Sequence, residues 1–241
     1  MIGLGTIINT AAVAAAGVAG HFLGGVFRED RQKAVCQACG VSVLFISVAG
    51  AMEGMLKIAS GSLTSGRSML IVLSVVLGTI AGELLNIEGG VERFGEWLKK
   101  KTGNAKDPQF VEAFVTASLT TCVGAMTIVG ALQDGLLGDY SMLAVKAVLD
   151  FAVVAVMCSG MSKGAAFSAI PIFVIQGTVT LFAKLIAPIM TDAAVGNLSL
   201  IGSVLIFCVG INLIWGKKIK VANMLPALLI AVLLAYLPFG L

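Results

Sequence analysis

Residues 143–154 read LAVKAVLDFAVV, an apolar run that contains one lysine and one aspartate four positions apart. The flanking sequence from Tyr140 to Met161 stays apolar for long enough to span a bilayer, which takes roughly 20 residues. Charged side chains inside such a span are costly and by default indicate a path for a solute or an ion. The stretch therefore predicts a membrane helix and raises the question of why it carries two charges.

The composition extends this prediction to the whole chain. Of its 241 residues, 58% are hydrophobic and only 12% are charged, whereas soluble domains usually carry about 25% charged residues. No soluble core hides so much apolar surface, so we expect an all-α polytopic membrane protein. The first apolar segment has neither a basic stretch before it nor a cleavage site after it, which predicts a retained helix.

Hydropathy predicts about eight spans in a single transmembrane domain, residues 1–241. Lys and Arg gather in alternate loops, for example Lys99–Lys101, and such loops stay inside the cell. Both termini are then expected outside; without the last, proline-bounded span there would be seven spans and an inside C-terminus. The expected spans are roughly 4–26, 35–57, 68–87, 109–137, 142–161, 165–189, 197–215 and 223–240.

Two pairs of segments resemble each other and predict an internal repeat of helical hairpins, about 4–57 and 68–137, followed by a second half, about 142–240. VAGHFL (18–23) matches IAGELL (80–85), and VAGAMEGML (48–56) matches IVGALQDGLL (128–137) with one inserted residue. The second copy also carries VERFGEWLKK (91–100). Its apolar and charged residues fall on opposite helical faces, which predicts an amphipathic helix, about 90–101, at the membrane interface.

Lys146 and Asp150 are the strongest candidates for a site. Four-residue spacing places them on one helical face, where each charge can neutralise the other. A rise of ~1.5 Å per residue puts Asp150 about 12 Å into the span, close to the middle of a core that is ~30 Å thick. A polar cavity for a solute or ion explains the pair; a packing role inside the helix bundle is the alternative.

Polar residues at similar depth are candidates for the lining of that cavity. Thr120 and Thr127 belong to a small and hydroxylated stripe of the 109–137 span, which close helix packing also explains. Gln176 follows Pro171, and a proline at this depth can kink or break its helix. Asn212 and Asn9 supply further amides.

The repeat brings further titratable residues to equivalent places, because His21 aligns with Glu83 and Glu53 aligns with Asp134. Asp134 and Glu83 are candidate carriers of coupling ions, or vestibule residues. Solvation at the membrane interface is the alternative for such side chains near the ends of spans.

Other chemistries have little support. The motif CQAC (36–39) has no second cysteine pair, which a zinc site usually needs, and all five cysteines lie in or beside spans, which argues against a disulfide framework. No nucleophile–base pair, phosphate loop or Rossmann glycine motif occurs. We therefore expect no enzyme activity, no cofactor, no metal and no binding of nucleic acid.

Four segments resemble one family, the YqgA-like bacterial integral membrane proteins (domain of unknown function 554), and the likeness extends from GTIINTAAV (5–13) to the last span. The segments are SLTTCVGAMTIVGALQDGLLGD (118–139), KAVLDFAV (146–153), FSAIPIFVIQG (167–177) and NMLPALLIA (223–231). The resemblance implies a bacterial inner-membrane protein. It implies no activity and transfers no site residues.

Together these observations predict a secondary transporter of a small solute or ion, coupled to a proton or a cation. Its site would contain Asp150 and Lys146 with Gln176, Thr120, Thr127 and Asn212. A channel lined by the 109–137 stripe, with Glu53 and Asp134 at its mouth, is one alternative. A scaffold or sensor whose partner docks on the Lys-rich loops is another. Expected partners are the lipid bilayer and further copies of the chain, with a dimer favoured.

Overall fold

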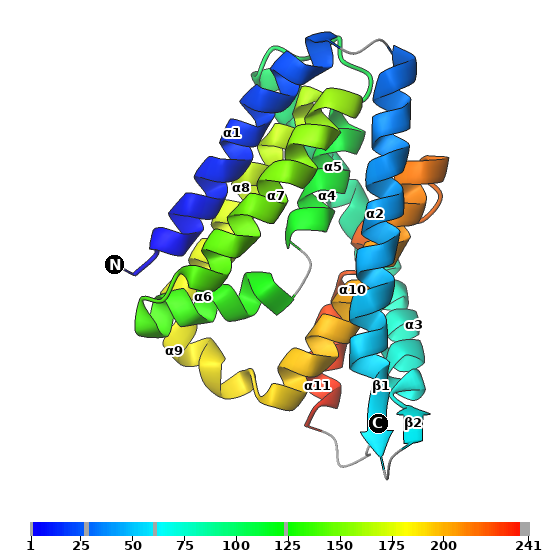
Figure 1. Cartoon of the computed structure of the whole chain (residues 1–241), viewed down its shortest axis with the longest axis vertical. Coiled ribbons are helices and arrows are strands. Elements are labelled where there is room, and N and C mark those ends of the chain that lie inside the picture. Colours follow the sequence, from blue (N-terminus) through cyan, green and yellow to red (C-terminus); the bar gives the residue numbers. More distant parts are fainter. Residues whose placement is uncertain (1, 27–28, 60–61, 123–124, 237–241) are drawn as a thin grey trace.

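The structure, a computed structural model, describes residues 2–26, 29–59, 62–122 and 125–236. Within these residues the chain consists of helices, connecting turns and one short hairpin (Figure 1), as the apolar composition predicts. The α-helices are α1 Leu4–Val26, α2 Glu29–Met55, α3 Ser68–Leu85, α4 Ile87–Lys101, α5 Phe110–Cys122, α6 Ala125–Leu137, α7 Ser141–Gly160, α8 Ala169–Leu181, α9 Ala183–Ile186, α10 Asp192–Trp215 and α11 Pro226–Leu234.

Short elements connect these helices. An antiparallel hairpin of β1, Leu56–Ala59, and β2, Ser62–Ser65, joins α2 to α3, and Leu56 pairs with Ser65 in its register. This hairpin was not expected from hydropathy. Three 3₁₀ turns complete the chain: η1 Lys163–Ser168, η2 Ala187–Ile189 and η3 Val221–Met224.

Five helical segments in the described part of the chain are long and apolar enough to cross a membrane, and a sixth results if α5 and α6 form one bent span. Two shorter apolar segments, Gly40–Met55 and Val221–Leu234, fall below the length of a span. The all-α membrane-like fold is confirmed, whereas about eight spans and the topology that follows from them are not.

Three long helix pairs form the framework. In Figure 1, α1 runs beside α7, α2 crosses α10, and α3 lies beside α11. Glycines permit the close approach: a Cβ atom on Gly20 of α1 would lie 2.5 Å from the carbonyl oxygen of Ala155 on α7. A Cβ atom on Gly82 of α3 would overlap the carbonyl oxygen of Asn223 in η3. Small residues thus bring helix backbones into contact, as in membrane bundles.

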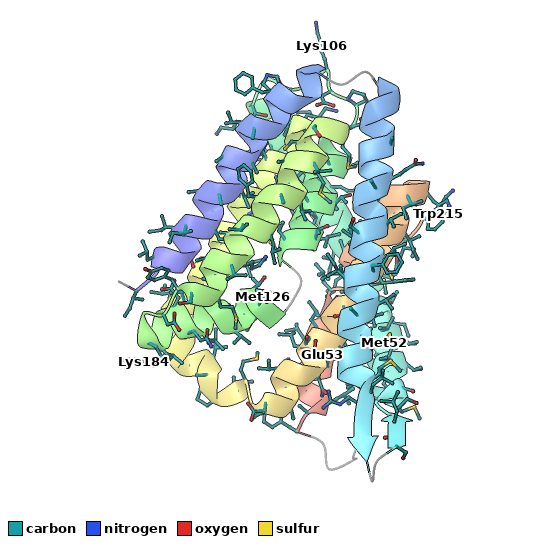
Figure 2. The ribbon with its side chains drawn as sticks, viewed as in Figure 1. Met52, Glu53, Lys106, Met126, Lys184 and Trp215 are labelled. Carbon is teal, nitrogen blue, oxygen red and sulfur yellow. The ribbon has the colours of Figure 1, made fainter. Side chains whose placement is uncertain are left out.

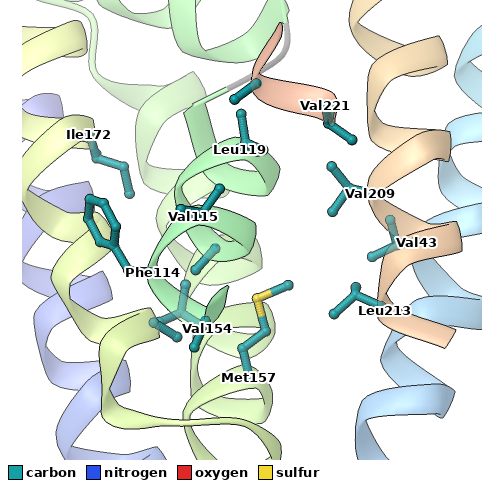
Figure 3. Close-up of a cluster of buried hydrophobic side chains, with 14 of the residues drawn as sticks. Val43, Phe114, Val115, Leu119, Val154, Met157, Ile172, Val209, Leu213 and Val221 are labelled. Carbon is teal, nitrogen blue, oxygen red and sulfur yellow. The ribbon is translucent and has the colours of Figure 1, made fainter. Parts of the chain in front are cut away.

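A continuous apolar core connects the framework to α5 in the middle. Figure 3 shows Phe114, Val115 and Leu119 of α5 among side chains from α7, α8 and α10. Phe110, at the start of α5, packs its ring 5.3 Å from the ring of Phe167 in η1. This core fixes α5 as the central helix of the molecule.

Two spans are divided differently from the prediction. The stretch 109–137, expected to be one helix, forms α5 and α6, whose axes differ in direction by 59°. The stretch 165–189 begins with the 3₁₀ turn η1, and α8 ends at Leu181. Pro171 lies in the first turn of α8, where a proline removes no helical hydrogen bond. Pro171 therefore does not break α8, and the bent stretch is the one between α5 and α6.

The amphipathic segment also differs from a simple surface anchor. It forms α4 three residues earlier than expected, and its buried side, which includes Glu88 and Leu98, packs on α5 and η3. Trp97 stays half exposed, stacked on Phe94. The predicted repeat is not confirmed, because α2 continues unbroken to Met55 while its counterpart is divided into α5 and α6.

Candidate polar site at the junction of α5 and α6

Lys146 and Asp150 form a buried ion pair on α7. Only 6% of Lys146 and 7% of Asp150 is exposed, and Lys146 Nζ lies 2.8 Å from Oδ1 and 2.6 Å from Oδ2 of Asp150. One turn of helix separates them, so the lysine side chain folds back onto the carboxylate and does not reach outward. The contact joins two opposite charges inside an otherwise apolar helix.

The break between α5 and α6 supplies a third partner for this pair. A helix leaves its last four carbonyl groups without helical donors, and α5 ends at Cys122. The freed carbonyl oxygen of Thr121 accepts a hydrogen bond from Lys146 Nζ at 2.7 Å and one from Thr127 Oγ1 of α6 at 3.3 Å. The lysine therefore connects α7 to the point where the chain changes direction.

Asn9 connects the same pair to α1. Its side-chain Nδ2 donates to Asp150 Oδ2 at 3.0 Å, and its side chain is fully buried. The other amide atom, Oδ1, is buried without a hydrogen-bond partner among the described residues. Asp150 is thus held from α1 and from its own helix, while Asn9 keeps an acceptor for a further donor.

Gln176 on α8 adds two more unpaired polar atoms. The side chain is fully buried, and neither Nε2 nor Oε1 has a hydrogen-bond partner in the described part of the chain. One turn later on α8, Thr180 contacts Thr6 of α1 at 3.3 Å. Since α1 and α8 run in opposite directions (Figure 1), this contact brings the turn that carries Gln176 beside the turn that carries Asn9.

Unpaired polar atoms at such positions are costly, about 1–3 kcal/mol for each buried group. In this polar cluster, the unpaired atoms of Asn9 and Gln176, near the ion pair and the freed carbonyl, therefore offer one donor and two acceptors to a small molecule or ion. Discontinuous helices with exposed backbone groups serve this purpose in many transporters.

Asp134 has a different environment from the one its alignment with Glu53 suggests. Its carboxylate accepts hydrogen bonds from the backbone amides of Gly3 at 3.1 Å, Gly5 at 3.0 Å and Thr6 at 3.4 Å. An anion at this position satisfies the unpaired amides of a helix start and stabilises its dipole. Asp134 therefore fastens α6 to the start of α1.

Three further candidates lie outside the cluster. Thr120 donates to the carbonyl of Thr116 within α5. Asn212 binds the backbone of Lys218 and Ile219 and shapes the turn after α10. Glu83 lies partly exposed at the end of α3, 3.3 Å from Lys220. Of the eight predicted site residues, the structure brings together Lys146, Asp150 and Thr127, with Gln176 in the neighbouring turn.

The backbone of Thr121 is the contributor that sequence reasoning missed. The stretch 109–137 is predicted as one span although it is longer than the roughly 17–25 residues that one span uses, and this excess length is the signal that could have revealed the break. The two cysteine side chains of the CQAC motif lie outside the described residues. Elsewhere in the described part of the chain, no group of three His, Cys, Asp or Glu side chains is arranged to hold a metal ion.

Comparison with known proteins agrees with the resemblance seen in the sequence. The chain is 28% identical over 230 residues to the uncharacterized membrane protein YdfK of Bacillus subtilis, which covers 94% of this chain and 93% of that one. It is 27% identical over 232 residues to the uncharacterized protein YqgA of Escherichia coli, covering 95% and 94%. No solved structure matches significantly. The family model described as "Protein of unknown function (DUF554)" matches residues 4–236, so the chain belongs to that family.

Proposed function

We propose that the protein is a secondary transporter of a small solute or ion in the bacterial inner membrane, coupled to a proton or a cation. The apolar helices and the relative named a membrane protein support a membrane location. Topology with both termini outside and assembly into a homodimer belong to the same proposal. We propose no enzymatic activity.

One observation carries the proposal: Lys146 binds both Asp150 and the carbonyl freed where α5 ends. A buried ion pair seldom stabilises a protein more than an apolar pair of the same volume. Its presence at a helix break, beside amides with unpaired atoms, is therefore better explained by binding and switching than by stability.

The contacts suggest how binding changes the shape of the protein. A proton or cation on Asp150 weakens its bond to Lys146, and the ammonium then relies on the Thr121 carbonyl. Because this carbonyl also binds Thr127, the angle between α5 and α6 responds to the state of Asp150. Asp134 joins α6 to α1, so both helices would move together and open one side of the site.

The channel alternative has less support from the contacts. Along the predicted stripe, Thr127 is buried against Thr121 and a Cβ atom on Gly130 would lie 2.8 Å from Leu143. The channel would also need Glu53 and Asp134 together at its mouth. Figure 2 shows Glu53 on α2, away from Lys184 of α9, and α9 packs against α6, the helix that carries Asp134, so Glu53 lies away from that part of the molecule. These contacts favour helix packing along the stripe over a water-filled pore.

Charge movement on solid-supported membranes tests the proposal. Purified protein in liposomes would receive pH and sodium jumps without a solute, and wild type would be compared with Asp150→Asn. We expect a transient current in wild type that Asp150→Asn loses and the control Asp139→Asn keeps, since Asp139 is exposed at the α6–α7 connection. An unchanged transient in Asp150→Asn would contradict the role of Asp150, and a sustained current would favour a channel.

A further inference from the structure

A second polar region lies along α5, between the break and the start of this helix. A cavity of about 360 Å³ opens between α4, α5 and the end of α10. Three glutamates of α4 at four-residue spacing line it, together with one glutamate of α5 and one lysine that follows α10: Glu88, Glu92, Glu96, Glu112 and Lys217. Apolar side chains of α5 and α10, such as Val115, complete the walls.

The cavity carries an excess of negative charge. Four carboxylates face one ammonium on its walls, which leaves three negative charges uncompensated by that lysine. Lys217 Nζ lies 2.7 Å from Glu88 Oε1 and also contacts Glu92. Glu96 and Glu112 form no ion pair with any described residue. The walls thus already bind one ammonium group and have carboxylates left for another.

Glu88 is the residue that points to a ligand. It is only 5% exposed, and its backbone amide donates to Asn223 Oδ1 at 2.7 Å. While Oε1 binds Lys217, Oε2 is buried without a hydrogen-bond partner among the described residues. Glu88 lines the cavity, and a buried carboxylate oxygen is an expensive group to leave unpaired. It gives a cationic donor a fixed place to bind.

We propose that this cavity binds a small aliphatic amine in its ammonium form, in competition with the ammonium of Lys217. Carboxylates suit the ammonium, and the apolar walls suit the hydrocarbon part of an amine. The volume falls within the range of small-molecule sites, roughly 300–1,000 Å³. No described group of three acidic, His or Cys side chains is arranged for a metal ion here, so the organic cation fits the walls better.

The position of the cavity connects it to the central polar cluster. Glu112, Thr116 and Thr120 follow one another at four-residue spacing along α5, on one helical face. The next residue is Thr121, whose carbonyl binds Lys146. As an entrance for the transported solute, the cavity rests on the proposed function; as a binding site for amines it stands independently.

Calorimetric titration of the full chain in detergent with 1,4-diaminobutane tests the proposal, at constant ionic strength and with 1,4-butanediol as the neutral counterpart. We expect saturable binding of the diamine and none of the diol. The double variant Glu96→Gln/Glu112→Gln should weaken binding at least about tenfold, because each removed charge attracted the ammonium at close range. Glu96 is exposed and Glu112 half-buried, so both substitutions are compatible with folding.

Lys217→Met should change the affinity for the diamine in the opposite direction, which distinguishes this site from a generally acidic surface. Removal of the competing ammonium should tighten binding roughly tenfold, whereas Asp139→Asn should change nothing. The proposal would be overturned if the diamine showed no saturable binding or if the diol bound equally well. It would also be overturned if sodium displaced the diamine as effectively as a second amine does, or if Lys217→Met bound the diamine more weakly than wild type.

The two proposals fail separately. Asp150→Asn should keep the affinity for the diamine and lose only the charge movement. Diamine binding without any charge movement in wild type would remove the transport proposal and leave the amine site. Charge movement without diamine binding would remove the amine site and leave the transporter.

Discussion

The molecule contains two lysine–carboxylate contacts whose surroundings are opposite in kind. Lys146 and Asp150 lie on one helix, are almost fully buried, and cancel each other's charge. Lys217 reaches from the turn after α10 to Glu88 and Glu92 of α4, with 43% of its side chain exposed and further acids nearby. The first contact completes a local hydrogen-bond network, while the second leaves negative charge available to bind a cationic ligand.

The difference teaches what each contact can do. A neutral, enclosed pair responds when one partner changes its charge, because breaking it strands an ion in an apolar interior. Removal of one partner from a partly exposed pair with additional carboxylates nearby changes the stability of the protein less. Such a pair nevertheless leaves a negative potential that concentrates cations at the cavity. The following variants, in order of expected effect on stability, sharpen or break this contrast.

The largest effect is expected for Asp150→Asn. Loss of one partner leaves the Lys146 ammonium buried, which costs about 3–5 kcal/mol of unfolding free energy. Chemical unfolding in detergent micelles measures this loss. The double variant Lys146→Met/Asp150→Leu should recover most of the stability without charge movement; a single variant as stable as wild type would show that the pair is not enclosed.

Gly82→Ala should have the next largest effect and should act on the acidic cavity. The added methyl group overlaps the carbonyl of Asn223, whose side chain holds the Glu88 amide. Overpacking of this kind costs about 1–3 kcal/mol, and affinity for the diamine should fall with it. Gly177→Ala is the matched control, because no atom lies within 4 Å of its added Cβ; equal losses in both variants would contradict the proposed contact.

Asp134→Ala tests the connection between α6 and α1. Three backbone amides lose their acceptor, which costs about 0.5–2 kcal/mol, typical of a lost helix cap. Hydrogen exchange at Gly5 and Thr6 should accelerate, while exchange in α10 stays unchanged. Protection equal to that of wild type would mean that the start of α1 is held by other contacts.

Lys217→Met should change stability least, by about 1 kcal/mol. Water screens the ammonium, whose side chain is 43% exposed, while the buried Glu88 carboxylate loses its partner and adds a desolvation cost. Partial burial opposes the charge on Lys217, but the hydrogen bonds to Glu88 and Glu92 outweigh it and raise the pKa of the ammonium. The contribution of the charged Lys217 side chain to the free energy of unfolding is therefore complete below the ordinary lysine pKa of about 10.4, and it is lost as pH rises through the higher folded-state pKa. The free energies of unfolding of wild type and Lys217→Met should therefore converge as pH rises through that folded-state pKa. A difference that stays constant with pH would contradict the role of the ammonium charge.

Sequence reasoning found the parts of the fold that depend on neighbouring residues. Hydropathy predicted helices, and the four-residue spacing of Lys146 and Asp150 placed both side chains on one face. The amphipathic pattern of 91–100 also placed its charged residues, Glu92 and Glu96 among them, on one face of a helix, but it did not include Glu88. Whether such a stripe faces water or a cavity depends on α5 and α10, which are distant in sequence.

Contacts between distant residues account for the rest. Asp134 matched Glu53 in the predicted repeat, yet its partners are amides near the N-terminus, more than a hundred residues away, about which local spacing says nothing. The bend between α5 and α6 had no proline to indicate it, while Pro171, a residue that can break a helix, fits the first turn of α8.

Asn9 and the first amides of α1 also have a consequence for biogenesis. Their partners Asp134 and Asp150 follow 131 and 141 residues later in the chain. At about 5–20 residues per second, translation takes roughly 7–30 s to supply them. The polar groups of α1 are thus synthesised well before their native partners, and their contacts with Asp134 and Asp150 form only after α6 and α7 have been synthesised.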